Sequence, residues 1–175
     1  MHRPLQVSLA ALLIACMASL AFAQADAAAG GSPRPIGKFA AWEAFADRGG
    51  GGKVCYAAAL PLRSKNEPKG RGKAYVMVSD RPADKSFGVV GVTAGFALKK
   101  GSPALLEVSG AKFDLYTVGD TAWSRDDKAV GLALEKGRTA TFVGFPAKGE
   151  PVADTYALEG FSDARAAIDK ECGAK

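Results

Sequence analysis

Turn-forming residues divide this chain into apolar segments that are too short for long helices. The 175 residues include 21 glycines and 9 prolines, and turn signals recur about every ten residues, a spacing typical of β-sandwiches and barrels. A chain of this length suits one domain with a substantial core. We therefore predict a mainly β, single-domain antiparallel β-sandwich or barrel over residues 36–175, with a helix at its C-terminal end.

The first two predicted strands flank a glycine cluster at residues 47–53. Its consecutive glycines supply the positive φ angles of a hairpin turn, and the cluster lacks the spacing of a phosphate-binding loop. The predicted strands are residues 38–46, 54–60, 74–80, 86–98, 104–110, 112–120, 138–146 and 154–161.

Residues 124–137 fit two interpretations. Ser124 is a candidate helix N-cap, Asp126 and Asp127 would complement the helix dipole, and Gly137 offers a C-cap. The alternation of apolar residues from 130 to 134 fits a strand better. The sequence leaves the choice between helix and strand open. The adjacent carboxylates could instead bind a cation or act as an acid/base pair.

The C-terminal helix is the clearest local prediction. Ser162 is its expected N-cap and Gly173 its end. Ala164, Ile168 and Cys172 are spaced four apart and therefore share one face, which must pack on the sheet.

The N-terminal segment is typical of a secretory signal peptide. Arg3 precedes a long apolar run that ends in Ala-Phe-Ala at Ala23, which matches a signal-peptidase site. We predict that residues 1–23 are a signal peptide and that residues 24–35, which are small and polar, form a flexible leader. Two alternatives stay open: an uncleaved membrane anchor, and lipidation at Cys16 within a lipobox-like Leu-Ile-Ala-Cys sequence.

Export would leave two cysteines in an oxidising compartment. Cleavage after Ala23 and lipidation at Cys16 both remove Cys16 from disulfide chemistry, so Cys55 and Cys172 remain. We predict a disulfide between them that joins the C-terminal helix to the first hairpin. The alternative is a pair of buried free thiols.

The mature chain would also lose His2, the only histidine. A chain without histidine has no Ser-His-Asp triad, no Cys-His pair and no histidine-based metal site. The S-x-x-K match at Ser109–Lys112 lies in a predicted turn without its partner motifs. We therefore predict no catalytic residues, no bound metal and no cofactor. The net charge of +5 is too small to indicate a nucleic-acid partner.

The loop at residues 61–73 carries five cations against one carboxylate, Glu67. Such a loop is a candidate site for anionic surfaces such as lipid head groups, lipopolysaccharide phosphates or host glycans. The alternative is a solvated charged loop. The five cations are Arg63, Lys65, Lys69, Arg71 and Lys73.

Several motifs occur together in one order: Cys-Tyr-Ala-Ala from Cys55, Tyr-Val-Met-Val-Ser-Asp-Arg-Pro from Tyr75, and a long C-terminal motif that runs from Asp154 to Cys172. They resemble the invasion-associated locus B family of exported alphaproteobacterial proteins over residues 39–172. The chain departs from the family at Ala157, where members often carry serine. The resemblance implies an exported cell-envelope protein, in some members linked to entry into host cells, and it assigns no catalytic residue.

Three functions compete on these observations. The first is a periplasmic or secreted cell-envelope interaction protein without catalysis, which could associate with the outer membrane. Its partners would be anionic envelope components or another envelope protein. The second is a periplasmic carbohydrate- or lipid-binding module, which exposed aromatic residues beside a groove would favour. The third is a hydrolase that uses only carboxylates, which an inward-facing pair in a deep cleft would favour. We expect Trp42 and Trp123 to belong to the core.

Overall fold

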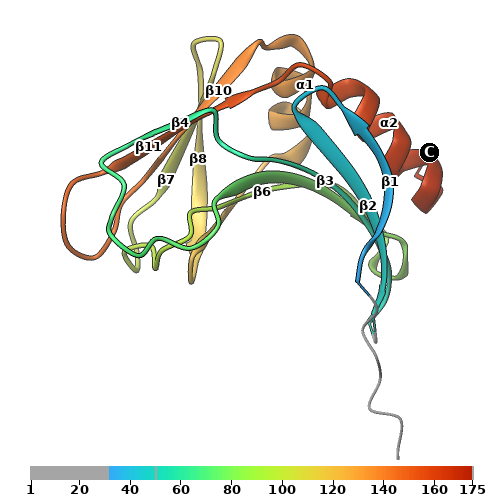
Figure 1. The fold of residues 1–175 in the computed structure, drawn as a ribbon, viewed down its shortest axis with the longest axis horizontal. Helices are drawn as coiled ribbons and strands as arrows, with labels where there is room; N and C mark the ends of the chain where they lie inside the picture. Colours follow the sequence, from blue (N-terminus) through green and yellow to red (C-terminus); the bar gives the residue numbers. More distant parts are fainter. Residues whose placement is uncertain (1–31, 50, 175) are drawn as a thin grey trace, which may run out of the picture.

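The computed structural model describes residues 32–49 and 51–174. These residues form one antiparallel sheet, two α-helices and a short 3-10 helix (Figure 1). The helices are η1 (Pro82–Asp84), α1 (Asp127–Lys136) and α2 (Phe161–Cys172). The strands are β1 (Arg34–Phe39), β2 (Trp42–Gly49), β3 (Gly52–Ala59), β4 (Arg63–Lys65), β5 (Tyr75–Arg81), β6 (Ser86–Thr93), β7 (Ala104–Val108), β8 (Ala111–Val118), β9 (Thr121–Trp123), β10 (Thr139–Gly144) and β11 (Val152–Ala157).

The 11 strands follow the order β1-β2-β3-β5-β6-β9-β8-β7-β10-β11-β4. Although β3 leads almost directly into β4, β4 pairs with β11 at the other end of this order. The sheet therefore bends back on itself. It is not a closed barrel, because β1 and β4 stand at the two ends of the order without pairing with each other. The predicted mainly β architecture with a C-terminal helix is confirmed.

Strand alternation separates a core face from an outer face. Alternate residues of β2, β3, β5 and β6 point toward the helices and are buried, as expected when one face of an antiparallel pair covers a core. Helix α2 packs over β1, β2, β3 and β5, and α1 packs over β6. The buried apolar residues of these four strands are Trp42, Ala44, Ala46, Cys55, Ala57, Ala59, Val76, Val78, Val90 and Val92.

Helix α2 begins one residue earlier than its predicted cap. Gly160, at φ +88°, occupies the N-cap position, whereas Ser162 lies inside the first turn and caps nothing. The chain needs glycine there because a side chain would strike the Phe39 carbonyl. The helix ends at Gly173 as predicted, and it buries Ala164, Ile168 and Cys172. The disulfide joins Cys172 to Cys55 of β3, with a Cα–Cα distance of 5.9 Å.

The ambiguous segment forms helix α1. Its N-cap is Asp126, whose carboxylate accepts a hydrogen bond from the Ala129 amide at 2.9 Å. Val130 and Leu134, one helical turn apart, are buried, while Leu132 between them is exposed. Ser124 accepts a hydrogen bond from the Asp126 amide and so supports the cap instead of being it.

Two predicted boundaries are wrong. β1 begins at Arg34, so the end of the predicted leader belongs to the sheet and the domain starts before residue 36. The predicted loop at residues 61–73 contains the short strand β4. The predicted signal peptide, the alternative lipidation site Cys16 and the first part of the leader lie outside the described residues. In the part of the chain that the structure describes, no helix has the length and apolar character needed to span a membrane.

Candidate functional site

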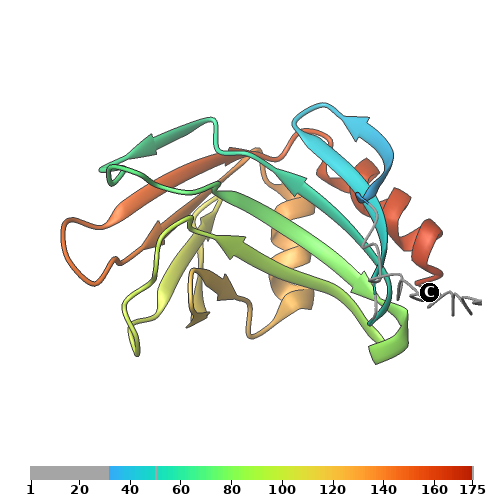
Figure 2. The ribbon, with the colours of Figure 1, turned by 60° about the horizontal axis from the view of Figure 1, so that its bottom comes forward.

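A groove lies on the outer face of β2, β3 and β5. Both α-helices lie on the other side of these strands (Figure 1), and Figure 2 turns the open face toward the viewer, with α1 behind it. The groove has a volume of about 840 Å³, which is within the range of small-molecule sites. Its floor includes the side chains of Phe45, Tyr56, Tyr75 and Met77.

The floor is made by the strand residues that alternate with the core. Phe45 of β2 is directly opposite Tyr56 of β3, and their rings stack with centroids 5.3 Å apart. Burial, assisted by the negative charge of Asp47, raises the pKa of Tyr56. Its phenol therefore stays neutral at physiological pH.

A second row of paired residues continues this face across three more strands, β6, β9 and β8. Ala58, Met77, Gly91, Trp123 and Tyr116 are consecutive cross-strand partners from β3 to β8. A Cβ at Gly91 would lie 2.8 Å from Trp123 Cζ3, so the glycine lets the indole lie on the backbone of β6, close to Met77. Trp123 is therefore half-buried on the outer face, and its predicted place in the core is wrong. The fully buried Trp42 does belong to the core.

Ser79 is an isolated polar group in the groove lining. It is only 2% exposed, and its Oγ makes no hydrogen bond. Its cross-strand neighbours are Tyr56 and Val89, which places it in the aromatic row. A buried hydroxyl without a hydrogen-bond partner destabilises the protein unless another molecule forms a hydrogen bond with it.

Cations outnumber carboxylates in the groove lining. Lys38 is paired with the single lining carboxylate, Glu43, at 3.1 Å. Lys73 comes just before β5 and Arg81 is its last residue, so these two cations stand at opposite ends of the groove. Neither is in an ion pair with any described residue.

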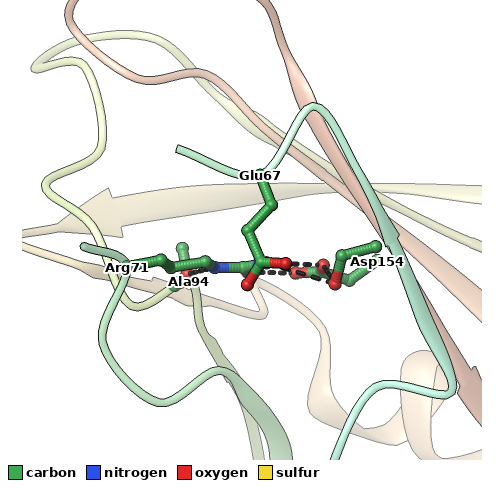
Figure 3. Close-up of polar contacts among 5 residues, drawn as sticks. Glu67, Arg71, Ala94 and Asp154 are labelled. Carbon is green, nitrogen blue, oxygen red and sulfur yellow. Dashed lines mark hydrogen bonds and ion pairs between the residues drawn. The ribbon is translucent and has the colours of Figure 1, made fainter. Parts of the chain in front are cut away.

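Arg71 is a structural residue and not a surface cation, so its predicted role in binding an anionic surface is wrong. Its side chain is only 2% exposed and lies in the interior with Asp154 (Figure 3). The guanidinium donates hydrogen bonds to both Asp154 carboxylate oxygens and to the Ala94 carbonyl. It also stacks over Phe96, with Cζ 5.5 Å from the ring centroid.

The other four loop cations, Arg63, Lys65, Lys69 and Lys73, are exposed. Only Lys73 lines the groove. Arg63 and Lys65 belong to β4, which pairs with β11, so the five predicted residues do not form one surface. No local sequence pattern distinguishes Arg71 from its neighbours, because its partner Asp154 is 83 positions away.

A family model described as "Invasion associated locus B (IalB) protein" matches residues 42–169. This chain belongs to the IalB family. The matched region contains the whole groove floor and most of helix α2. The family resemblance predicted from the sequence is confirmed.

A solved structure agrees with this assignment at the level of the fold. The crystal structure of invasion associated protein B from Bartonella henselae aligns with a TM-score of 0.52 and 22% sequence identity, covering 77% of this chain and 96% of that one. Comparison with curated proteins finds no match.

Two carboxyl groups of this IalB-family chain lie beside the disulfide, with Asp80 fully buried and Asp169 partly buried. Asp80, the cross-strand partner of Cys55, accepts a hydrogen bond from the Gly88 amide at 2.7 Å. Its Oδ2 and the Oδ1 of Asp169 are buried without a partner. Burial raises the pKa of Asp80 to about 6, and the neighbouring carboxyl of Asp169 adds to the rise.

This carboxyl pair does not form a hydrolytic site on the groove. Neither Asp80 nor Asp169 lines the groove, and Asp80 is fully buried between the sheet and α2. The Ser109–Lys112 match spans the tight turn between β7 and β8, as predicted. Across residues 32–49 and 51–174, no three His, Cys, Asp or Glu side chains group as metal ligands.

The residues that shape the groove were not singled out from the sequence. Ser79, Met77 and Arg81 occupy alternate positions of β5, opposite in direction to the buried Val76 and Val78. That period-two pattern was a usable signal, because it places one polar, one flexible apolar and one cationic side chain on the same outer face.

Proposed function

We propose that this protein is an exported, non-catalytic binding protein of the cell envelope and that the groove is its binding surface. The observation that carries the proposal is an open groove floored by Phe45, Tyr56, Tyr75 and Met77 on the sheet face opposite both α-helices. Partly buried aromatic side chains that line a concavity are typical of ligand-binding sites. The groove offers one carboxylate, Glu43, which Lys38 already neutralises, so its chemistry suits binding.

Site-specific photocrosslinking in intact cells tests the binding surface. A benzoylphenylalanine at Tyr56 reports on the groove, and the same group at Ala166, exposed on α2, is the matched control. We expect a discrete envelope component to be crosslinked from position 56 and not from position 166. Equal labelling from both positions, or none from position 56, would contradict the proposal.

Export is tested separately by intact mass. We expect the exported protein to begin at Gln24. A diacylated chain that begins at Cys16 would show the lipoprotein alternative instead, and a full-length chain in the membrane fraction would show the uncleaved anchor.

A further inference from the structure

We infer that the groove binds a single-chain amphiphile with a phosphate head group. The head group would be held by Arg81 and Ser79, and the hydrocarbon chain would lie over Met77 toward Leu60 and Leu62. This inference rests on the proposed function and names the chemical class of its ligand.

The floor favours a hydrocarbon chain over a sugar. Apart from Ser79, the hydroxyl groups in the lining are those of Tyr56 and Tyr75, whereas a sugar needs several directed hydrogen bonds. Met77 is a flexible apolar side chain that adapts to irregular ligands. Its small neighbour Ala58, directly opposite on β3, leaves room above the backbone.

The apolar path continues to one end of the groove. Leu60 and Leu62, at 67% and 65% exposed, are the most exposed large apolar residues of the described chain. Both line the groove just beyond the end of β3. When a ligand covers such exposed apolar side chains, it removes their surface from water, and this hydrophobic contribution favours binding.

The opposite end supplies the contacts for an oxyanion. Arg81 and Ser79 are two residues apart on β5 and so point to the same face. A phosphate has three acceptor oxygens, enough for the two-pronged guanidinium and the Ser79 hydroxyl together. The unpartnered Ser79 Oγ, buried in the lining, would then gain the hydrogen bond that the protein does not give it.

The net charge of the lining favours an anionic ligand. Lys38, Lys73 and Arg81 face one carboxylate, Glu43. Asp47 is directly opposite Val54, which lines the groove together with Arg81, and its negative charge would oppose the phosphate. Removing that charge should therefore strengthen binding.

Isothermal titration calorimetry of the full mature chain tests the inference, with each probe below its micelle concentration. The probes are dodecyl phosphate, dodecylphosphocholine, dodecanoate and butyl phosphate. We expect dodecyl phosphate to bind best, dodecanoate and dodecylphosphocholine about tenfold more weakly, and butyl phosphate not measurably. Equal affinity for dodecyl phosphate and dodecylphosphocholine would overturn the role of the phosphate.

Variants locate the head group. Ser79→Ala and Arg81→Gln should each weaken dodecyl phosphate binding about tenfold, and Asp47→Asn should strengthen it. Lys112→Gln removes an exposed cation of β8 that does not line the groove, and it is the matched control, with little expected effect. An equal loss for Lys112→Gln and Arg81→Gln would show general electrostatic attraction and overturn the inference.

Other occupants of the groove give distinct results. Binding to anionic vesicles but not to monomeric dodecyl phosphate would assign the face to a membrane surface. A dimer that Met77→Glu dissociates would assign it to a second copy of this chain. Either result overturns the inference yet leaves position 56 at a binding surface, whereas failure of the crosslinking experiment would remove the proposed function itself.

Discussion

Two nitrogens of the Arg71 guanidinium bind the two carboxylate oxygens of Asp154, at 2.9 Å and 2.5 Å. Asp154 is fully buried on β11 and also accepts a hydrogen bond from Ser64 of β4. Arg71 in turn reaches the Ala94 carbonyl just after β6. The pair thus ties the loop that follows β4 to both halves of the bent sheet.

Breaking this pair should destabilise the protein strongly. Asp154→Asn would remove the buried counter-charge of the guanidinium and leave only the exposed carboxylate of Glu67, 3.8 Å away. We expect the free energy of unfolding to fall by about 3–5 kcal/mol. Urea denaturation measures this change in the free energy of unfolding. Lys69→Ala, in the same loop but exposed, is the control and should change the free energy of unfolding by less than about 0.5 kcal/mol. Similar small effects for both variants would show that the pair contributes little.

The acid pair beside the disulfide should make stability depend on pH. Asp80 has a folded-state pKa of about 6, above its ordinary value of 3.8, so the folded protein binds the extra proton between these values. Stability is therefore highest below about pH 4 with respect to this group, and it falls as the pH rises through 6.

Asp80→Asn isolates that effect. The amide can still accept from Gly88 and can donate to the unpartnered Asp169 oxygen. We expect the variant to be more stable than the wild type at pH 7, by on the order of 2–3 kcal/mol, with the difference disappearing near pH 4. Thermal melts across this range measure it, with the exposed Asp84→Asn as control. A difference that is constant with pH would exclude Asp80 as the titrating group.

Local patterns in the sequence predicted the fold better than they predicted the site. The turn at Ser109-Gly110, the strands around it and the end of α2 at Gly173 depend on short-range turn and cap chemistry. Long-range contacts decided the rest. Gly160 replaces Ser162 as the cap because Phe39, far away in sequence, approaches it, and no local rule contains that information.

The groove depends on long-range strand pairing in the same way. Met77, Gly91 and Trp123 lie in one row only because β5, β6 and β9 pair in that register. The alternation in the sequence shows that β5 has a buried face and an outer face, but it does not show which residues of the neighbouring strands pair with it. The prediction that Arg71 binds an anionic surface was wrong for the same reason: its charge is paired with Asp154 of β11, a long-range contact that the sequence does not show.

Gly160 should tolerate no side chain. Its φ is +88°, and a Cβ there would lie 2.0 Å from the Phe39 carbonyl oxygen, so Gly160→Ala combines backbone strain with a clash against main chain. Gly110→Ala is the matched control, because φ is also +88° but nothing lies within 4 Å. We expect Gly110→Ala to cost about 1–2 kcal/mol and Gly160→Ala clearly more, measured by thermal denaturation. Equal losses would show that backbone strain alone determines the cost.

The Cys55–Cys172 disulfide should stabilise the fold without being required for it. It closes a loop of 117 positions, for which the chain-entropy model gives about 4–5 kcal/mol as an upper figure. Helix α2 is also held by Phe161, whose ring packs edge-on against Trp42 at 4.9 Å, and by the buried Ile168. The Cys55→Ser/Cys172→Ser double variant should therefore keep its β-sheet circular dichroism spectrum while its Tm falls by about 10 °C.

Reduction provides the control for that variant. Both cysteines are buried, so we expect thiol reagents to label neither in the native oxidised protein and both after unfolding with reductant. Reductant present during a thermal melt should lower the Tm of the wild type toward that of the double variant and leave the variant unchanged. Free thiols in the native exported protein, or a double variant as stable as the wild type, would contradict a stabilising bridge between β3 and the C-terminal helix.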